Sequence, residues 1–210
     1  SEALERAVPG QWTRLTLKAK HWKWHARSCV TYWTQTQPEI LKQRYDAVFT
    51  SSLVPICELI ALNRSLATVP IIVYCHENQF SYPSRRPRER DNHFGFSEFI
   101  NFQVATQVVF NSEFNRSSFL ENAGKFLKRM PDCSLLGQLD KIANKSEVVP
   151  VLFDYPCLEP EPTQIINPRG PLILWNHRWE HDKNPEAFFD ALHHLHAQGV
   201  PFRLSLCGQR

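Results

Sequence analysis

The sequence lacks long apolar runs, closely paired cysteines and internal repeats. None of its apolar patches, such as Val69–Cys75, approaches the roughly 18 residues of a membrane-spanning helix, so we predict no span. The six cysteines are scattered without a C-x-x-C pair, which argues against disulfides and a zinc site and favours a reducing, cytoplasmic location. The formal net charge of +3 is small, so the distribution of charge matters more than its sum.

Neither end of the sequence resembles a domain boundary. The chain starts with Ser1 instead of Met, has no basic-then-apolar signal pattern, and its first residues look like the middle of a helix. Residues 202–210 are typical of a strand that runs into a glycine turn. We therefore expect the chain to be cut at both ends.

Apolar, β-branched runs alternate with segments of helical periodicity along the chain. The runs predict buried strands at 15–17, 47–50, 71–75, 108–110, 148–152, 172–175 and 203–207. The segments between them predict helices at 54–63, 96–105, 113–126 and 185–198. This alternation indicates an α/β fold with a parallel sheet.

A stretch rich in proline interrupts this pattern between residues 153 and 171. We place an N-terminal domain at 1–158, a linker at 159–170, and the start of a second domain at 171–210. This last segment holds a single βαβ unit, which cannot form a whole domain. A second breaker-rich island, at 81–90, is predicted to be a loop.

Polar residues that directly follow the predicted strands are the first site candidates, because open α/β sheets bind ligands at the carboxyl ends of their strands. His76, Glu77, Asn78 and Gln79 follow one such strand. Four hydrogen-bonding side chains in a row suit a sugar rich in hydroxyls. His76 is the catalytic candidate, because it can orient a hydroxyl or stabilise developing charge with Glu77 as its partner. Alternatively, His76 and Asn78 cap the next segment through local backbone bonds.

A second candidate, Ser112, follows the strand predicted at 108–110. Its first predicted role is to cap the helix that starts at Glu113, by accepting a backbone N–H. A cap at the carboxyl end of a strand is also a contact point for an anion or a hydroxyl. We therefore keep Ser112 as a substrate-binding candidate.

The polar loop 176–183 leads into the last predicted helix. Arg178 and Lys183 can direct two cations at a pyrophosphate, and free N–H groups at the helix start add to the field. The same spacing also fits a solvated loop in which Arg178 pairs with Glu180 or Asp182. Histidines on the helix after this loop lack convergent ligand geometry, so we predict no metal site.

Residues 18–27 interleave cations with tryptophans. Such a composition is typical of surfaces that neutralise phosphates and stack on bases. RNA is therefore a predicted partner, and Lys20, Lys23, Trp24 and Arg27 are the candidate contacts.

Motifs along nearly the whole chain resemble the tRNA-queuosine α-mannosyltransferase family. The most specific is Asn-His-Arg-Trp-Glu-His-Asp-Lys at 176–183, whereas the Asn-Ser pair after a strand occurs in many proteins. The motifs are Lys20–Arg27, Tyr74–Gln79 with Tyr82 and Pro83, Val109–Ser112 with Phe114 and Asn115, and Asn176–Lys183 with Pro185 and Glu186.

The resemblance implies a retaining glycosyltransferase of the GT-B fold, with two Rossmann-like domains that face each other across a cleft. This chain would supply one Rossmann-like domain and the first βαβ unit of the second. The reaction would move mannose from GDP-mannose, a substrate, to the cyclopentene ring of queuosine at the tRNA wobble position, without a cofactor.

The resemblance also suggests roles for individual residues. Arg178 and Lys183 match the cations that grip the donor pyrophosphate in related enzymes, where they stabilise the leaving group. His76 matches a residue that contacts the transferred sugar. The family's first strand, with its glycine-containing loop, would precede Ser1 and its acidic donor motif would follow Arg210, so we expect the chain alone to be inactive. Two other functions stay open: transfer to a lipid, glycan or small molecule, and a non-catalytic RNA-binding module.

Overall fold

The computed structural model describes residues 2–18, 20–82, 92–152 and 169–207. These residues form two compact units, which we describe separately: unit 1 comprises the described residues up to 152, and unit 2 comprises 169–207. Both are α/β units with parallel strands, as the sequence predicts. The loop predicted at 81–90 and the linker predicted at 159–170 lie almost entirely outside the described residues, so these limits stay predictions.

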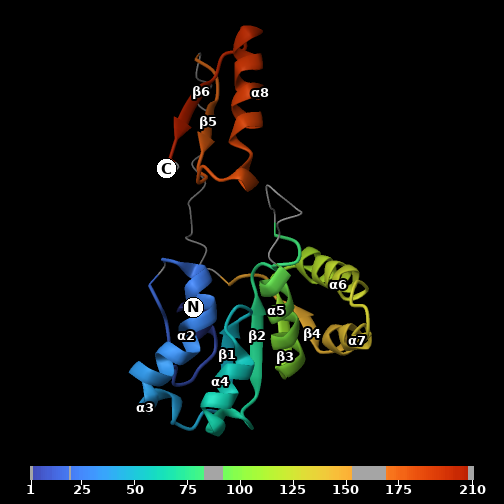
Figure 1. Ribbon diagram of the computed structural model, residues 1–210. Helices are drawn as coiled ribbons and strands as arrows, with labels where there is room; N and C mark the ends of the chain where they lie inside the picture. The colour runs from blue at the N-terminus through green and yellow to red at the C-terminus, as the bar shows by residue number, and fades with distance from the viewer. Residues whose placement is uncertain (1, 19, 83–91, 153–168, 208–210) are drawn as a thin grey trace. The chain divides into compact units, whose positions relative to one another are not determined.

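A four-stranded parallel sheet forms the centre of unit 1 (Figure 1). Its strands lie side by side in chain order: β1 (Val48–Ser51), β2 (Ile71–Cys75), β3 (Gln107–Phe110) and β4 (Ser146–Val148). Parallel neighbours are joined by right-handed crossovers, so strands in sequential order place all their connecting helices on the same face.

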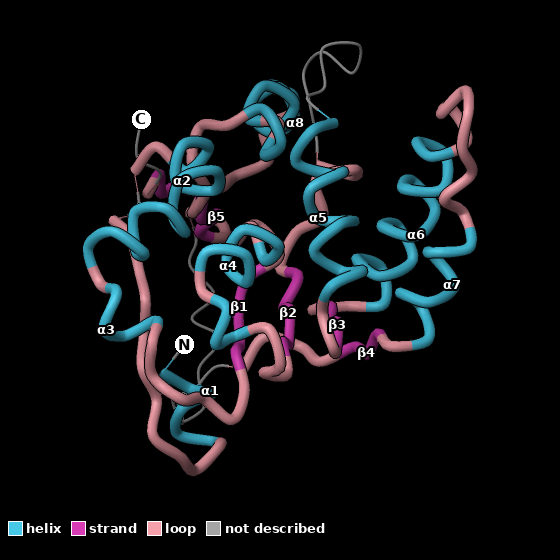
Figure 2. Tube along the Cα trace, turned by 60° about the horizontal axis from the view of Figure 1, so that its bottom comes forward, coloured by secondary structure: helices cyan, strands magenta, loops and turns pink. Residues whose placement is uncertain are grey.

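Helices α4 (Ile56–Leu62), α5 (Asn92–Val104) and α6 (Glu113–Leu127) cover that face, and α7 (Gly137–Asn144) packs against α5 and α6 (Figure 2). Strand alternation turns Val73, Val108 and Phe110 toward these helices, where they are fully buried. The ring of Phe102 packs edge-on against Phe110 and Phe119, with centroids 5.5 and 4.7 Å away. Such aromatic pairs contribute about 0.5–1.5 kcal/mol each beyond their buried area.

A second, smaller core lies beside strand β1, where α2 (Trp22–Thr36) packs against α3 (Pro38–Leu41) and α4. Cys29, Val30 and Trp33 are buried at helical spacing on α2. We did not predict this helix, because its aromatic and β-branched residues are mediocre helix formers. The signal for this helix was the spacing of its three apolar residues, which recur at positions i, i+1 and i+4.

The strand predicted at 15–17 is wrong. Leu15 and Leu17 lie in a segment without strand pairing, and they pack partly buried against the core of α2. The two leucines alternate because both side chains pack against this core, and not because the segment belongs to a hydrogen-bonded sheet. The helical start of the chain is confirmed as α1 (Glu2–Ala7), and a short 3-10 helix, η1 (Arg64–Leu66), precedes β2.

The strand predicted at 71–75 is confirmed with the same bounds, and the other predicted elements of unit 1 are confirmed with shifted ends; the shifts of four residues are at the start of α5 and at the end of β4. We predicted this strand at 148–152, but it spans Ser146–Val148. The N–H of Val149 still donates to the carbonyl of Phe110 at 2.9 Å, but Pro150 has no N–H with which to continue the ladder.

Unit 2 is the predicted βαβ unit. Strands β5 (Leu172–Trp175) and β6 (Arg203–Leu206) are parallel, and α8 (Pro185–Ala197) connects them after a 3-10 turn, η3 (His181–Lys183). The buried ring of Trp175 lies 4.5 Å from that of Phe188. Gly170 has a positive φ of 80°, and a Cβ there would lie 2.0 Å from the carbonyl oxygen of Pro201, so only glycine fits.

Candidate active site

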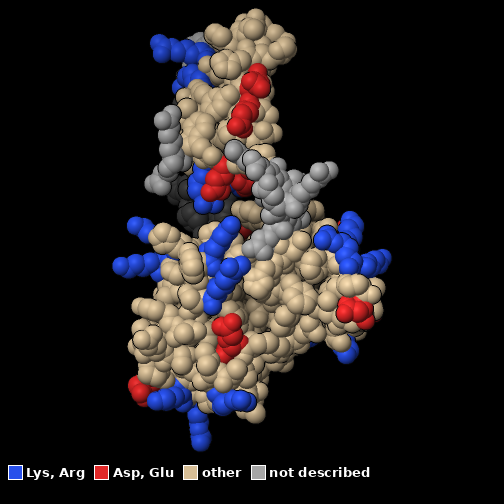
Figure 3. All heavy atoms as spheres, viewed as in Figure 1, with Lys and Arg blue, Asp and Glu red and all other residues tan. Residues whose placement is uncertain are grey.

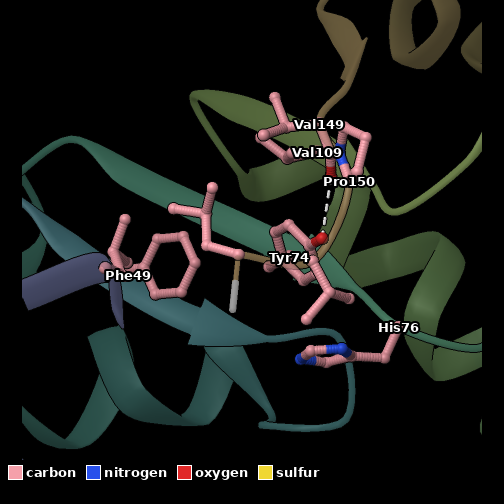
Figure 4. A pocket seen from close by; sticks show the side chains of 9 residues that line it. Phe49, Tyr74, His76, Val109, Val149 and Pro150 are labelled. Atoms are coloured by element: carbon pink, nitrogen blue, oxygen red, sulfur yellow. Dashed lines mark hydrogen bonds between the residues drawn. The ribbon is translucent and has the colours of Figure 1, made fainter. Parts of the chain in front are cut away.

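His76 follows β2 at the carboxyl edge of the sheet of unit 1. Its ring packs against Tyr74, with centroids 4.7 Å apart, and Tyr74 lies 6.0 Å from Phe49. The strand register turns Phe49, Tyr74 and Val109 toward the face opposite the crossover helices. A row of rings on that face therefore ends at His76 (Figure 4).

An apolar pocket of about 250 Å³ opens along this row of rings. The hydroxyl of Tyr74 donates to the carbonyl of Val149 at 2.7 Å, which ties the segment after β4 to β2 (Figure 4). His76 brings a polar ring to this mostly apolar lining. The lining residues are Leu4, Phe49, Tyr74, His76, Val109, Val149, Pro150, Val151 and Leu152.

A second pocket, of about 500 Å³, shares Phe49, Tyr74 and His76 with the first. Unlike the first, it is partly basic, because Lys18 and Lys20 line it. His76 therefore borders both an apolar pocket and a basic one.

The imidazole of His76 is suited to hydrogen bonding in its neutral form. Partial burial lowers the pKa of His76 below its usual value, although nearby Glu77 acts in the opposite direction. A neutral imidazole offers one N–H donor and one acceptor nitrogen, which matches a sugar hydroxyl. Glu77 is exposed and Gln79 is half-buried at the same edge.

Two asparagines that follow β3 hold the backbone around His76. The side-chain amide of Asn111 donates to the carbonyl of His76 at 2.8 Å. The amide of Asn115 donates to the carbonyl of Cys75 at 2.9 Å. These bonds fasten the end of β2 to the loop after β3, which fixes where the imidazole can lie.

Asn78, predicted from the sequence to bind sugar, belongs instead to this buried framework. It is only 5% exposed. Its amide donates to Asn115 Oδ1 at 2.8 Å and to Ser118 Oγ at 3.0 Å, while its oxygen accepts the N–H of Ser81 at 2.9 Å. Its hydrogen-bonding groups are thus used within the protein: the bond from Ser81 is the local backbone bond of the alternative prediction, whereas Asn115 and Ser118 are distant in the sequence.

Glu98 on α5 supports the same loop from the core, and the sequence analysis missed it. Its fully buried carboxylate accepts the hydroxyl of Ser52 and the backbone N–H of Gln79, both at 2.7 Å. Burial raises the pKa of Glu98 to about 7. The available signal was spacing: Glu98 shares a face of α5 with Phe94 and Phe102, which are both buried.

Ser112 caps α6 as predicted. Its hydroxyl accepts the N–H of Asn115 at 3.2 Å, and its backbone is extended. The hydroxyl remains at the carboxyl edge of the sheet beside Asn111.

In unit 2, both predicted cations of the loop 176–183 form ion pairs with nearby acids. Arg178 Nη1 lies 3.2 Å from Glu180 Oε1, and Lys183 Nζ lies 2.8 Å from Asp182 Oδ2. The hydrogen bond from Lys183 lowers the pKa of Asp182. The Arg178 side chain is 71% exposed, and exposed pairs of this kind are weak, so an incoming anion can replace the carboxylate.

The described ranges contain no group of three or more His, Cys, Asp or Glu side chains that could hold a metal ion. No helix in that part of the chain is both long and apolar enough to cross a membrane.

Comparisons with known proteins identify the family of this chain. The family model described as tRNA-queuosine alpha-mannosyltransferase N-terminal matches residues 1–152. A tRNA-queuosine alpha-mannosyltransferase from Drosophila melanogaster is 37% identical over 201 residues, which cover 92% of this chain and 53% of the relative. The chain belongs to the tRNA-queuosine alpha-mannosyltransferase family. It spans about half the length of that relative, and no solved structure matches it significantly.

Within this tRNA-queuosine alpha-mannosyltransferase family member, the range matched by the family model contains all described residues of unit 1. His76 and Ser112 therefore lie in the matched range, whereas Arg178 and Lys183 lie beyond it.

The four predicted RNA contacts of this family member lie around the start of α2 but have different surroundings. Trp24 is 75% exposed, and Lys20 and Lys23 are exposed beside it. Arg27 lies over the ring of Phe94, 4.7 Å from its centroid, and so also packs α2 against α5.

Proposed function

We propose that the full-length protein transfers mannose from GDP-mannose to queuosine in the anticodon of a tRNA, in the cytoplasm. One observation carries the proposal: in a chain of a mannosyltransferase family, the imidazole of His76 borders an apolar and a basic pocket at the carboxyl edge of the sheet. We further propose a GT-B fold with two Rossmann-like domains. Unit 1 would be the acceptor-side domain, and unit 2 the first edge of the donor site.

In the proposed reaction, the bond between mannose C1 and the β-phosphate oxygen breaks, and a bond forms between C1 and a hydroxyl oxygen of queuosine. The hydroxyl proton passes to the departing diphosphate or to solvent. We propose that the configuration at C1 is retained. Negative charge develops on the departing GDP, so cations placed there accelerate the reaction. Arg178 and Lys183 supply them by exchanging their carboxylate partners for the pyrophosphate.

His76 would contact a hydroxyl of the transferred mannose as a neutral imidazole, with Glu77 as its partner. Gln79 and Ser112 would contact further hydroxyls at the same edge. Replacement of His76 by Ala is expected to lower kcat at least tenfold in the full-length protein. His76→Gln is expected to lower kcat less than His76→Ala does, because the Gln amide can also donate and accept a hydrogen bond. If neither substitution changes kcat, the proposed role of His76 is wrong.

The acceptor is tested with radiolabelled GDP-mannose, the full-length protein, and one tRNA prepared with and without queuosine. Label is expected only in the tRNA that carries queuosine. Equal labelling of both would overturn the queuosine assignment, and labelling of a lipid, glycan or small molecule alone would move the same chemistry to another acceptor. Residues 1–210 alone are expected to be inactive, because the donor site would be incomplete.

The donor loop is tested by Arg178→Ala in the full-length protein. We expect weaker GDP-mannose binding and slower transfer with unchanged tRNA binding. Intact transfer would contradict the role of the loop. Loss of tRNA binding alone would instead favour a non-catalytic RNA-binding module.

A further inference from the structure

A shallow groove of about 880 Å³ runs between residues 16–18 and helix α2. Trp24, Ser28 and Tyr32 follow one another at four-residue intervals and therefore share the face of α2 that lines the groove. The full lining is Thr16, Leu17, Lys18, His21, Trp24, His25, Ser28, Tyr32 and Gln37.

Two large aromatic rings stand in solvent along this groove. Trp24 is 75% exposed and Tyr32 is 49% exposed, whereas Trp33 on another face of the same helix is buried in the core. The core of unit 1 therefore does not need the two exposed rings. Each offers an open π-face on which a flat ring can stack.

The residues that line the groove include Lys18, His21 and His25 but no Asp or Glu. Residues 7–38 contain no Asp or Glu, but they contain five Lys or Arg residues and two histidines. The first turn of α2 lacks the acidic residues that favour a helix N-terminus, so its positive field is not compensated there. Lys and Arg side chains gather over the start of α2 on the face drawn in Figure 3.

The groove is continuous with the candidate active site. It shares Thr16, Leu17, Lys18 and His25 with the 500 Å³ pocket that contains His76. A strand of nucleic acid with one nucleotide at His76 would therefore have its neighbouring nucleotides beside Trp24.

We propose that the α2 groove binds unpaired nucleotides adjacent to the glycosylated nucleotide of the acceptor RNA. Their bases stack on Trp24 and Tyr32, and Lys18 neutralises the phosphates between them. Exposed rings along a groove that is lined by a lysine and no acidic residue are features that suit single-stranded nucleic acids. Because stacking is possible with every base, the groove would tolerate different neighbours of the modified nucleotide. The inference rests on the proposed function only in that the acceptor is an RNA.

The test measures binding of a fluorescent anticodon stem-loop RNA to the full-length protein by anisotropy, which is independent of mannose transfer. Trp24→Ala is expected to weaken binding about 5- to 150-fold, the range for loss of one base–aromatic stack, and Trp24→Phe is expected to restore most of it. Lys18→Ala should reduce the slope of log affinity against log salt by about one. Lys42→Ala, an exposed lysine outside the groove, is the matched control and should leave binding unchanged.

A stem-loop with abasic nucleotides beside the modified position separates stacking from a general loss of structure. The abasic RNA should bind the wild-type protein more weakly than the intact RNA, while Trp24→Ala should bind both equally. If the abasic sites weaken both proteins to the same extent, or if Trp24→Ala binds the intact RNA like the wild type, the inference is wrong. Wild-type protein that binds the RNA in this way but transfers no mannose would contradict the proposed function and leave the groove assignment supported.

Discussion

Replacement of Glu98 by Gln tests whether a buried carboxyl group makes the stability of unit 1 depend on pH. The pKa of Glu98 is about 7 in the folded protein, against an ordinary value of 4.5, because the group is fully buried. The folded state therefore binds the proton more tightly than the unfolded state does. The stability from this proton is fully present below pH 4.5 and is lost as the pH rises through 7.

The size of the effect follows from the two pKa values. Their separation corresponds to a loss of about 3 kcal/mol of unfolding free energy, most of it between pH 5 and 8. Gln at position 98 is neutral at every pH. Its amide oxygen can accept the N–H of Gln79 and its NH₂ can donate to Ser52 Oγ, so both present partners stay bonded.

The measurement is urea unfolding of the full-length protein at several pH values from 5 to 8. The unfolding free energy of Glu98→Gln, relative to wild type, is expected to rise by about 2 to 3 kcal/mol across this range. Glu58→Gln, an exposed glutamate on α4, is the control and should follow the wild type throughout. The reasoning is refuted if the difference in unfolding free energy between Glu98→Gln and the wild type stays constant from pH 5 to 8.

Two further predictions compare matched residues. Phe119→Ala removes a fully buried ring from the aromatic core and should cost about 3–5 kcal/mol of unfolding free energy, whereas Phe114→Ala, 78% exposed on the same helix, should change it by less than about 0.5 kcal/mol. Similar losses from both would contradict the assigned core. Gly170→Ala should destabilise unit 2 more than Gly199→Ala, because both glycines have positive φ but only Gly170 faces the backbone of Pro201. Hydrogen exchange of α8 and β6 measures this difference, and equal protection in the two variants would contradict it.

Features that depend on nearby residues could be predicted from the sequence. The strand at 71–75 follows from a short apolar run, and the cap of Ser112 on α6 joins residues only three positions apart. The start of α8 at Pro185 follows from the preference of proline for the first helical turn. The position of His76 at the carboxyl end of a strand could be predicted as soon as the end of that strand at Cys75 was recognised.

Features that depend on distant partners could not be predicted in this way. Leu15 and Leu17 alternate as in a strand, but they bury against α2 without forming a ladder. Asn78 looked like a sugar ligand in its polar run, yet its side-chain partners Asn115 and Ser118 lie 37 and 40 positions along the chain.

The sequence by itself determined the parallel α/β class, the edge of the sheet at which polar side chains collect, and the two cationic motifs. These properties follow from strand and helix periods and from local charge. Only the tertiary structure decided which polar residues are buried as framework and which border a pocket. That division depends on contacts such as Glu98 with Ser52, 46 positions apart, because burial and hydrogen-bond satisfaction are set by whatever the fold brings against each side chain.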